Sequence, residues 1–161
     1  MSSGHNRGEV TGMKIVLAND HGGFQLKQSV RKYLEEAGHL VEDVGCFSDQ
    51  SVDYPDFAFP AAEAVSRGDA ECGILFCTTG IGVSICANKV KGIRCALCTS
   101  TFQAEMTRRH NNANMLALGA KTVTEEEALA IVDTFLNTAF EGGRHLKRVN
   151  KISEYENKLE D

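Results

Sequence analysis

The sequence lacks an excess of basic charge. It contains 17 Lys and Arg residues against 22 Asp and Glu residues, a formal net charge of −5. Proteins that coat nucleic acid or lie on anionic membranes present strongly basic surfaces, so this composition argues against both kinds of partner. A local group of basic side chains could still bind a small anion.

Long apolar runs are also lacking. None approaches the roughly 20 residues that a helix needs to cross a bilayer. The first residues are polar and contain no apolar core, so we expect no signal peptide and a cytoplasmic location. We expect residues 1–12 to be a flexible extension or an expression remnant. Residues 13–161 are long enough for a single domain with a substantial core.

The cysteines lack the spacing of a disulfide scaffold. Most of the six lie in apolar runs, which favours reduced, buried thiols: Cys46, Cys72, Cys77, Cys86, Cys95 and Cys98. Cys95 and Cys98 have the spacing of half a zinc site. They fall on a predicted strand, however, where residues three apart point to opposite faces. No second Cys or His pair completes the set, so we expect no metal.

What the sequence does contain is a regular alternation of strands and helices. Short apolar runs predict strands at 14–18, 39–44, 72–77, 93–98 and 115–118. Helical spacing predicts helices at 26–37, 57–66, 82–88, 101–110, from 124 to about 139, and from 144 towards the C-terminus. Ser100 is a predicted N-cap and Thr124 opens a predicted capping box. The order predicts a Rossmann-like three-layer α/β/α sandwich, with a five-stranded parallel sheet and an extended C-terminal helix.

One stretch, 73–85, combines a strand, a turn and a helix start. Its turn holds two threonines and two glycines. Ile85 stands where a dinucleotide fingerprint needs its third glycine, and Val83 stands where a phosphatase loop needs arginine. No Walker lysine follows. What remains is a turn whose backbone N–H groups can hold an oxyanion, or else a plain strand-to-helix turn.

Cys77 ends the strand of this stretch. It could be an inert, buried residue. It also lies at the carboxyl end of a parallel strand, where ligands bind, and near a helix N-terminus, which favours the thiolate. A thiolate can act as a nucleophile or as a general base, and the residues alone leave both roles open.

Polar and basic residues elsewhere extend the candidate site. Asp20 and His21 follow the first predicted strand and should share the edge that carries Cys77. Arg144 and Arg148 lie one helical turn apart, a placement that suits a phosphate but also an ordinary basic face. Lys121, after the fifth strand, is another possible phosphate contact.

Seven segments, in this order and spacing, resemble the type B ribose-5-phosphate isomerase family, which includes galactose- and allose-6-phosphate isomerases. They are Asn-Asp-His-Gly-Gly-Phe (19–24), Val-Asp-Tyr-Pro-Asp (52–56), Gly-Ile-Leu-Phe-Cys-Thr-Thr-Gly-Ile-Gly (73–82), Ala-Asn-Lys (87–89), Gly-Ile-Arg (92–94), Arg-His-Asn (109–111) and Glu-Gly-Gly-Arg-His (141–145). The resemblance covers nearly the whole chain from about Met13.

This resemblance implies an aldose–ketose isomerase that interconverts D-ribose 5-phosphate and D-ribulose 5-phosphate, through a cis-enediolate and without a cofactor. It implies that Cys77 moves the proton between C1 and C2, that His110 opens the sugar ring, and that Thr79 assists proton movement between the oxygens. Another branch of the family has a carboxylate at the position of Val83, so this chain resembles the cysteine branch.

The same resemblance implies the binding residues. The turn would hold the enediolate oxygens, and other residues the sugar and its phosphate: Thr78, Gly80, Ile81 and Gly82 in the turn, Asp20, His21, Tyr54 and Asn111 for the sugar or phosphate, and Lys121, Arg144 and Arg148 for the phosphate. Lys121 replaces an arginine more often found there, and Thr78 replaces a commoner glycine. The resemblance also implies homodimers with shared active sites, and sometimes tetramers.

Alternatives from other classes stay open at this point. The chain could isomerise allose or galactose 6-phosphate, or bind a sugar phosphate without turning it over. It could also be a thiol redox protein that uses Cys77 or the Cys95–Cys98 pair, although no clear resolving thiol accompanies Cys77.

Overall fold

The computed structural model describes residues 9–159. Its centre is a five-stranded, wholly parallel sheet in the order β2-β1-β3-β5-β4. The strands are β1 (Lys14–Asn19), β2 (Leu40–Asp43), β3 (Cys72–Cys77), β4 (Cys95–Leu97) and β5 (Met115–Gly119). Every residue of β3, the central strand, is buried. This agrees with an apolar run that shows no polar alternation, because both faces of a parallel sheet are covered.

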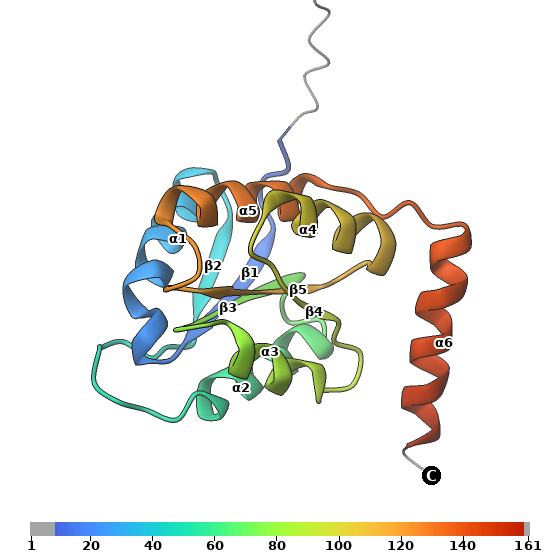
Figure 1. Ribbon diagram of the computed structural model, residues 1–161, viewed down its shortest axis with the longest axis horizontal. Helices are drawn as coiled ribbons and strands as arrows, with labels where there is room; N and C mark the ends of the chain where they lie inside the picture. Colours follow the sequence, from blue (N-terminus) through green and yellow to red (C-terminus); the bar gives the residue numbers. More distant parts are fainter. Residues whose placement is uncertain (1–8, 160–161) are drawn as a thin grey trace, which may run out of the picture.

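Helices cover both faces of the sheet (Figure 1). One face carries α1 (Phe24–Glu36), α4 (Thr101–Met106) and α5 (Glu125–Asn137), whose apolar side chains share one core cluster with alternate strand residues. The other face carries α2 (Pro55–Ser66) and α3 (Ile81–Asn88), which pack in a second cluster. The predicted three-layer α/β/α sandwich is therefore confirmed.

The last helix, α6 (Arg144–Lys158), stands beside the sandwich (Figure 1). Its buried residues are His145 and Val149, and it packs against the turn that follows α4. Three large apolar side chains on it, and Leu159 at its C-cap, are exposed: Leu146, Ile152 and Tyr155 are those on the helix. The extended C-terminal helix is thus confirmed, and most of its surface is uncovered within one chain.

Several predicted boundaries need correction. The strands predicted at 39–44 and 93–98 are shorter, as β2 and β4, because each lies at a sheet edge and pairs on one side only. The helix predicted at 57–66 begins earlier, at Pro55, because proline suits a first helical turn. The helix predicted to reach about residue 139 ends at Asn137.

The helix predicted at 101–110 is two elements. After α4 the backbone widens into a π-helical segment, η2 (Thr107–Asn111), which ends where Asn112 adopts a left-handed φ of 46°. A short 3-10 turn, η1 (His21–Gly23), precedes α1. The Ser100 N-cap and the Thr124 capping box are both confirmed.

The cysteine reading agrees with the fold. Cys98 belongs to the cluster on one face of the sheet, and Cys95 packs against the cluster on the other. The six cysteines are free thiols. Burial raises the pKa of both Cys95, to about 12, and Cys98, to about 11. No helix within residues 9–159 is long and apolar enough to cross a membrane.

Candidate functional site

The turn after β3 is built around the thiol of Cys77. The side chain is 5% exposed, and its Sγ accepts a hydrogen bond from the backbone N–H of Gly80 at 3.0 Å. Gly80 has a φ of 78°, and a Cβ there would lie 2.9 Å from the Leu118 carbonyl carbon. Only glycine fits, and its N–H is thereby directed at the sulfur. The thiol of Cys77 is thus held in one place by a backbone donor of its own turn.

The other N–H groups of the turn are not all available. Ile81 N–H donates to Thr79 Oγ1 at 3.2 Å, so it and the Gly80 N–H already have partners. The backbone N–H of Gly82, in the first turn of α3, donates to no acceptor among the described residues. Fewer backbone N–H groups of this turn are therefore left to bind an oxyanion than the sequence predicted.

Three residues predicted to bind substrate lie around this turn. Asp20 is buried beside Phe76, whose carbonyl accepts its N–H at 3.1 Å. A Cβ on Gly22 would lie 2.2 Å from Thr78 Oγ1, so the His21-Gly22 turn packs directly on the β3 turn. The Tyr54 ring covers Gly82, where a Cβ would come within 2.8 Å of it.

Lys121 completes this group. Its backbone N–H donates to the Thr78 carbonyl at 3.0 Å, and Ala120 N–H donates to the Cys77 carbonyl at 2.9 Å. Its side chain is exposed at the same edge. We call Asp20, His21, Tyr54, residues 77–82 and Lys121 the sheet half of the candidate site.

A buried lysine holds the loop above the sheet half, a feature that the sequence reading missed. Lys27 is fully buried, and its Nζ lies 2.8 Å from Asp43 Oδ2 and donates to the Cys46 carbonyl at 2.9 Å. Further along the loop, Val52 N–H donates to His21 Nδ1 at 3.2 Å. Lys27 thus fixes the start of the segment that ends in Tyr54. Its signal in the sequence is weak, because a lysine on a helix is usually exposed.

The remaining predicted residues lie elsewhere. His110 and Asn111 belong to η2, while Arg144 and Arg148 are exposed on α6. Glu141 N–H donates to the Arg109 carbonyl at 3.1 Å, and α6 packs on η2. We call His110, Asn111, Arg144 and Arg148 the helical half.

The two halves lie at opposite ends of the strands. Gly73 N–H, at the start of β3, donates to the Asn114 carbonyl at 3.2 Å, which puts the end of η2 near the amino ends. Cys77 ends the same strand, six residues long, or about 16 Å at its usual rise. Cys77 therefore lies at the carboxyl ends of the strands, whereas the segment on which α6 packs lies near their amino ends. The three predicted phosphate ligands therefore do not meet, since Lys121 belongs to the sheet half.

The helical half contains a further pair that the sequence reading left without a role. His145 stacks on His110, with ring centroids 4.2 Å apart and an interplanar angle of 12°. Its Nε2 lies 3.3 Å from Glu141 Oε2. The ligand atoms of His110, Glu141 and His145 lie within 4.8 Å of one another, close enough for a metal. Arg109, Arg144 and Arg148 surround them, however, and this positive charge disfavours a cation and favours an anion.

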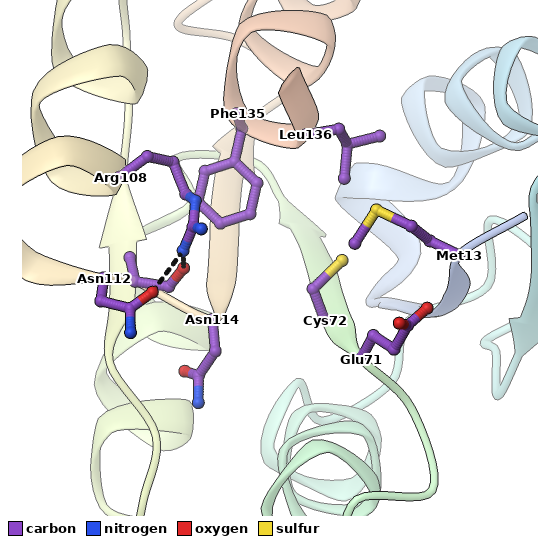
Figure 2. A pocket seen from close by; sticks show the side chains of 9 residues that line it. Met13, Glu71, Cys72, Arg108, Asn112, Asn114, Phe135 and Leu136 are labelled. Carbon is purple, nitrogen blue, oxygen red and sulfur yellow. Dashed lines mark hydrogen bonds between the residues drawn. The ribbon is translucent and has the colours of Figure 1, made fainter. Parts of the chain in front are cut away.

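One partly enclosed cavity lies outside both halves. It holds about 180 Å³ at the amino ends of the strands and is lined by Met13, Glu71, Cys72, Arg108, Asn112, Ala113, Asn114, Phe135 and Leu136 (Figure 2). Arg108 is occupied there, donating to Asn112 Oδ1 and to the Ala113 carbonyl. Burial raises the pKa of the Cys72 thiol to about 12, so this thiol is a poor nucleophile.

The arrangement is that of an α/β protein that binds a small ligand beyond the carboxyl ends of a parallel sheet, next to a thiol. A sequence profile of the family described as Ribose/Galactose Isomerase matches residues 15–152. The chain belongs to this family.

Individual relatives agree. Ribose-5-phosphate isomerase B of Escherichia coli (strain K12) is 44% identical over 143 residues, which are 89% of this chain and 96% of that protein. The solved structure of the Clostridium thermocellum ribose-5-phosphate isomerase B has a TM-score of 0.90 at 51% identity, covering 91% of this chain and 99% of that one. The Mycoplasma genitalium enzyme, solved with bound ribulose-5-phosphate, has a TM-score of 0.87 at 44% identity, covering 92% and 99%.

Proposed function

We propose that this protein is a ribose-5-phosphate isomerase that interconverts D-ribose 5-phosphate and D-ribulose 5-phosphate in the cytoplasm, as a step of the pentose phosphate pathway. The observation that carries the proposal is the Cys77 thiol under the Gly80 N–H, at the carboxyl edge of the sheet, in a chain of this family. The relatives named ribose-5-phosphate isomerase B support the choice of substrate.

The proposed reaction is a proton transfer. His110 first opens the furanose, giving a proton to the ring oxygen as the hydroxyl at C1 loses one. The Cys77 thiolate then removes the proton from C2, and the negative charge moves onto the oxygen at C1. Cys77 returns a proton to C1 while Thr79 assists transfer between the two oxygens. A preformed donor such as the Gly82 N–H would stabilise the charge as it develops.

We further propose that the active unit is a homodimer, in which the sheet half of one subunit meets the helical half of the other. Three facts support this. The two halves lie at opposite ends of the strands in one chain. Ile81 and Ile85 expose apolar side chains beside the turn on α3. Most of the apolar surface of α6 also has no cover within the described chain.

In such a dimer each half would hold one part of the substrate. The sugar would lie next to Cys77, held by Asp20, His21, Tyr54 and Lys121. Arg144 and Arg148 of the second subunit would hold the phosphate.

An isomerase assay tests the function. Ribose, allose and galactose phosphates are supplied at matched concentrations to the purified protein and to Cys77→Ser. We expect turnover of ribose 5-phosphate that Cys77→Ser abolishes. Turnover of a hexose phosphate alone would change the substrate and keep the reaction. No turnover of any sugar, with retained binding, would make this a binding module.

A further inference from the structure

His145 is buried on a helix that is otherwise mostly exposed. His145 is 6% exposed, and it shares the buried side of α6 with Val149. A polar ring at such a position needs a partner. Its neighbour across the contact is His110, the residue to which the proposed function gives ring opening.

The contact between the two rings is close and nearly parallel. Their centroids are 4.2 Å apart and their planes differ by 12°. His110 is only partly buried, whereas His145 is held by the packing of α6 on η2. The better-fixed ring therefore limits the orientations of the more mobile one.

Glu141 lies on the other side of His145 and is itself paired with Arg109. Glu141 Oε2 lies 3.3 Å from His145 Nε2, and Glu141 Oε1 lies 3.4 Å from Arg109 Nη1. Arg109 also pairs with Glu105 of α4 at 2.9 Å. Burial lowers the pKa of His145, and the nearby His110 and Arg144 lower it further. The lowered pKa favours the uncharged form of His145, which repels a neighbouring positive charge less than an imidazolium would.

We propose that His145 is a positioning residue that orients His110 by stacking, so that His110 faces the ring oxygen of the bound furanose. The proposal rests on the proposed function, which supplies the role of His110. It assigns a task to a side chain that touches His110 and none of the residues around Cys77.

A chemical difference between the two substrates provides the test. Ribose 5-phosphate is mostly a closed furanose. Ribulose 5-phosphate has its O5 blocked by phosphate, cannot form that ring and stays open. Exchange of its C1 hydrogen with deuterated water, followed by NMR, therefore reports the proton transfer by Cys77 without ring opening.

We expect His145→Ala to slow conversion of ribose 5-phosphate by at least about tenfold, because a small misplacement of a catalytic group can cost up to about 100-fold. Deuterium exchange into ribulose 5-phosphate should stay within about twofold of wild type, since that step does not use His110.

Two further variants serve as rescue and control. His145→Phe retains a flat ring for stacking and should restore most of the conversion. Lys147→Ala, at an exposed position of α6, is the matched control and should match wild type in both assays. Circular dichroism and size-exclusion chromatography confirm that each variant is folded and assembled.

Three results would overturn the proposal. His145→Ala could slow both reactions equally, which would indicate a general structural or phosphate-binding role. It could slow neither. His145→Phe could be as impaired as His145→Ala, which would exclude stacking as the cause.

His110→Ala distinguishes failure of the proposed function from failure of the role proposed for His145. If it converts ribose 5-phosphate normally, ring opening by His110 is wrong and the role of His145 falls with it. If it is impaired while His145→Ala is not, only the proposal for His145 is wrong.

Discussion

The sheet half and the helical half are built by different physical means. In the sheet half, backbone hydrogen bonds between strand ends and a glycine in a left-handed conformation fix Cys77 and its turn. In the helical half, exposed arginines stand on a helix beside the sandwich, and the contacts are side-chain stacking and partly exposed ion pairs. One half is therefore held by contacts within the sandwich. The other presents most of its basic side chains to the surroundings.

The two halves also suit different tasks in the proposed reaction. A general base needs an accurately placed, partly dehydrated environment, which the end of a buried strand provides. Phosphate binding needs positive charge that remains accessible, which an exposed helix provides. In the proposed dimer, each requirement would be met by the element that suits it.

The largest effect is expected in the sheet half. Cys77→Ser replaces the base by a hydroxyl that does not ionise near neutral pH, and should lower kcat by about 1,000-fold, within the usual range for loss of a general base. The side chain is small and its removal opens no large cavity, so the midpoint of thermal unfolding should hardly change. Steady-state kinetics and a thermal scan check both values. Full activity in a folded variant would refute the assignment of the base.

The second prediction compares the stability that ion pairs beside each half give to the fold. Lys27→Met leaves Asp43 with only the partly exposed Arg31 as its ion-pair partner, and should cost about 3 kcal/mol of unfolding free energy. Arg109→Met removes partly exposed ion pairs to Glu105 and Glu141, and should cost less than about 1 kcal/mol. Urea titration of both variants measures the difference. Equal costs would mean that the two halves are not distinguished by burial.

A third prediction concerns substrate binding by the helical half. Arg144→Ala removes a guanidinium from the proposed phosphate site and should raise KM by about 10- to 100-fold, the worth of a hydrogen bond to a charged group. The change in kcat should be much smaller, because the phosphate is remote from the reacting carbons. Lys147→Ala, on the same helix, serves as the control. An unchanged KM would count against Arg144 as a phosphate ligand.

The last prediction has the smallest amplitude and is the most direct test of the division. Cys77→Ser lacks a working sheet half, and Arg144→Ala lacks a working helical half. If the halves meet across a dimer, exchange of subunits in an equal mixture gives mixed dimers with one intact site. Activity at low substrate should then rise to about a quarter of wild type. A mixture no more active than the average of its two components would place each site within one chain.

Much of the fold could be predicted from the sequence. The apolar run 72–77 is unambiguous because a central parallel strand is buried on both faces, and the caps at Ser100 and Thr124 mark helix starts directly. The edge strands were predicted too long because their ends lack the second neighbour that would extend them. The widened turn at 107–111 has no local signal, since it is set by the packing of α6 and by Arg94, which binds the carbonyls of Asn111 and Asn112.

By itself, the sequence determined the order of strands and helices, the turn that follows Cys77 and the residues available for chemistry. These are local properties, fixed by side-chain spacing and by the conformations that glycine alone can adopt. Only the tertiary structure decided which residues meet. It brought Tyr54 over Gly82, buried Lys27 against Asp43 and stacked His145 on His110. It also placed the sheet half and the helical half at opposite ends of the strands. Such distances depend on how a parallel sheet sends successive chain segments to its two opposite ends, which no local pattern records.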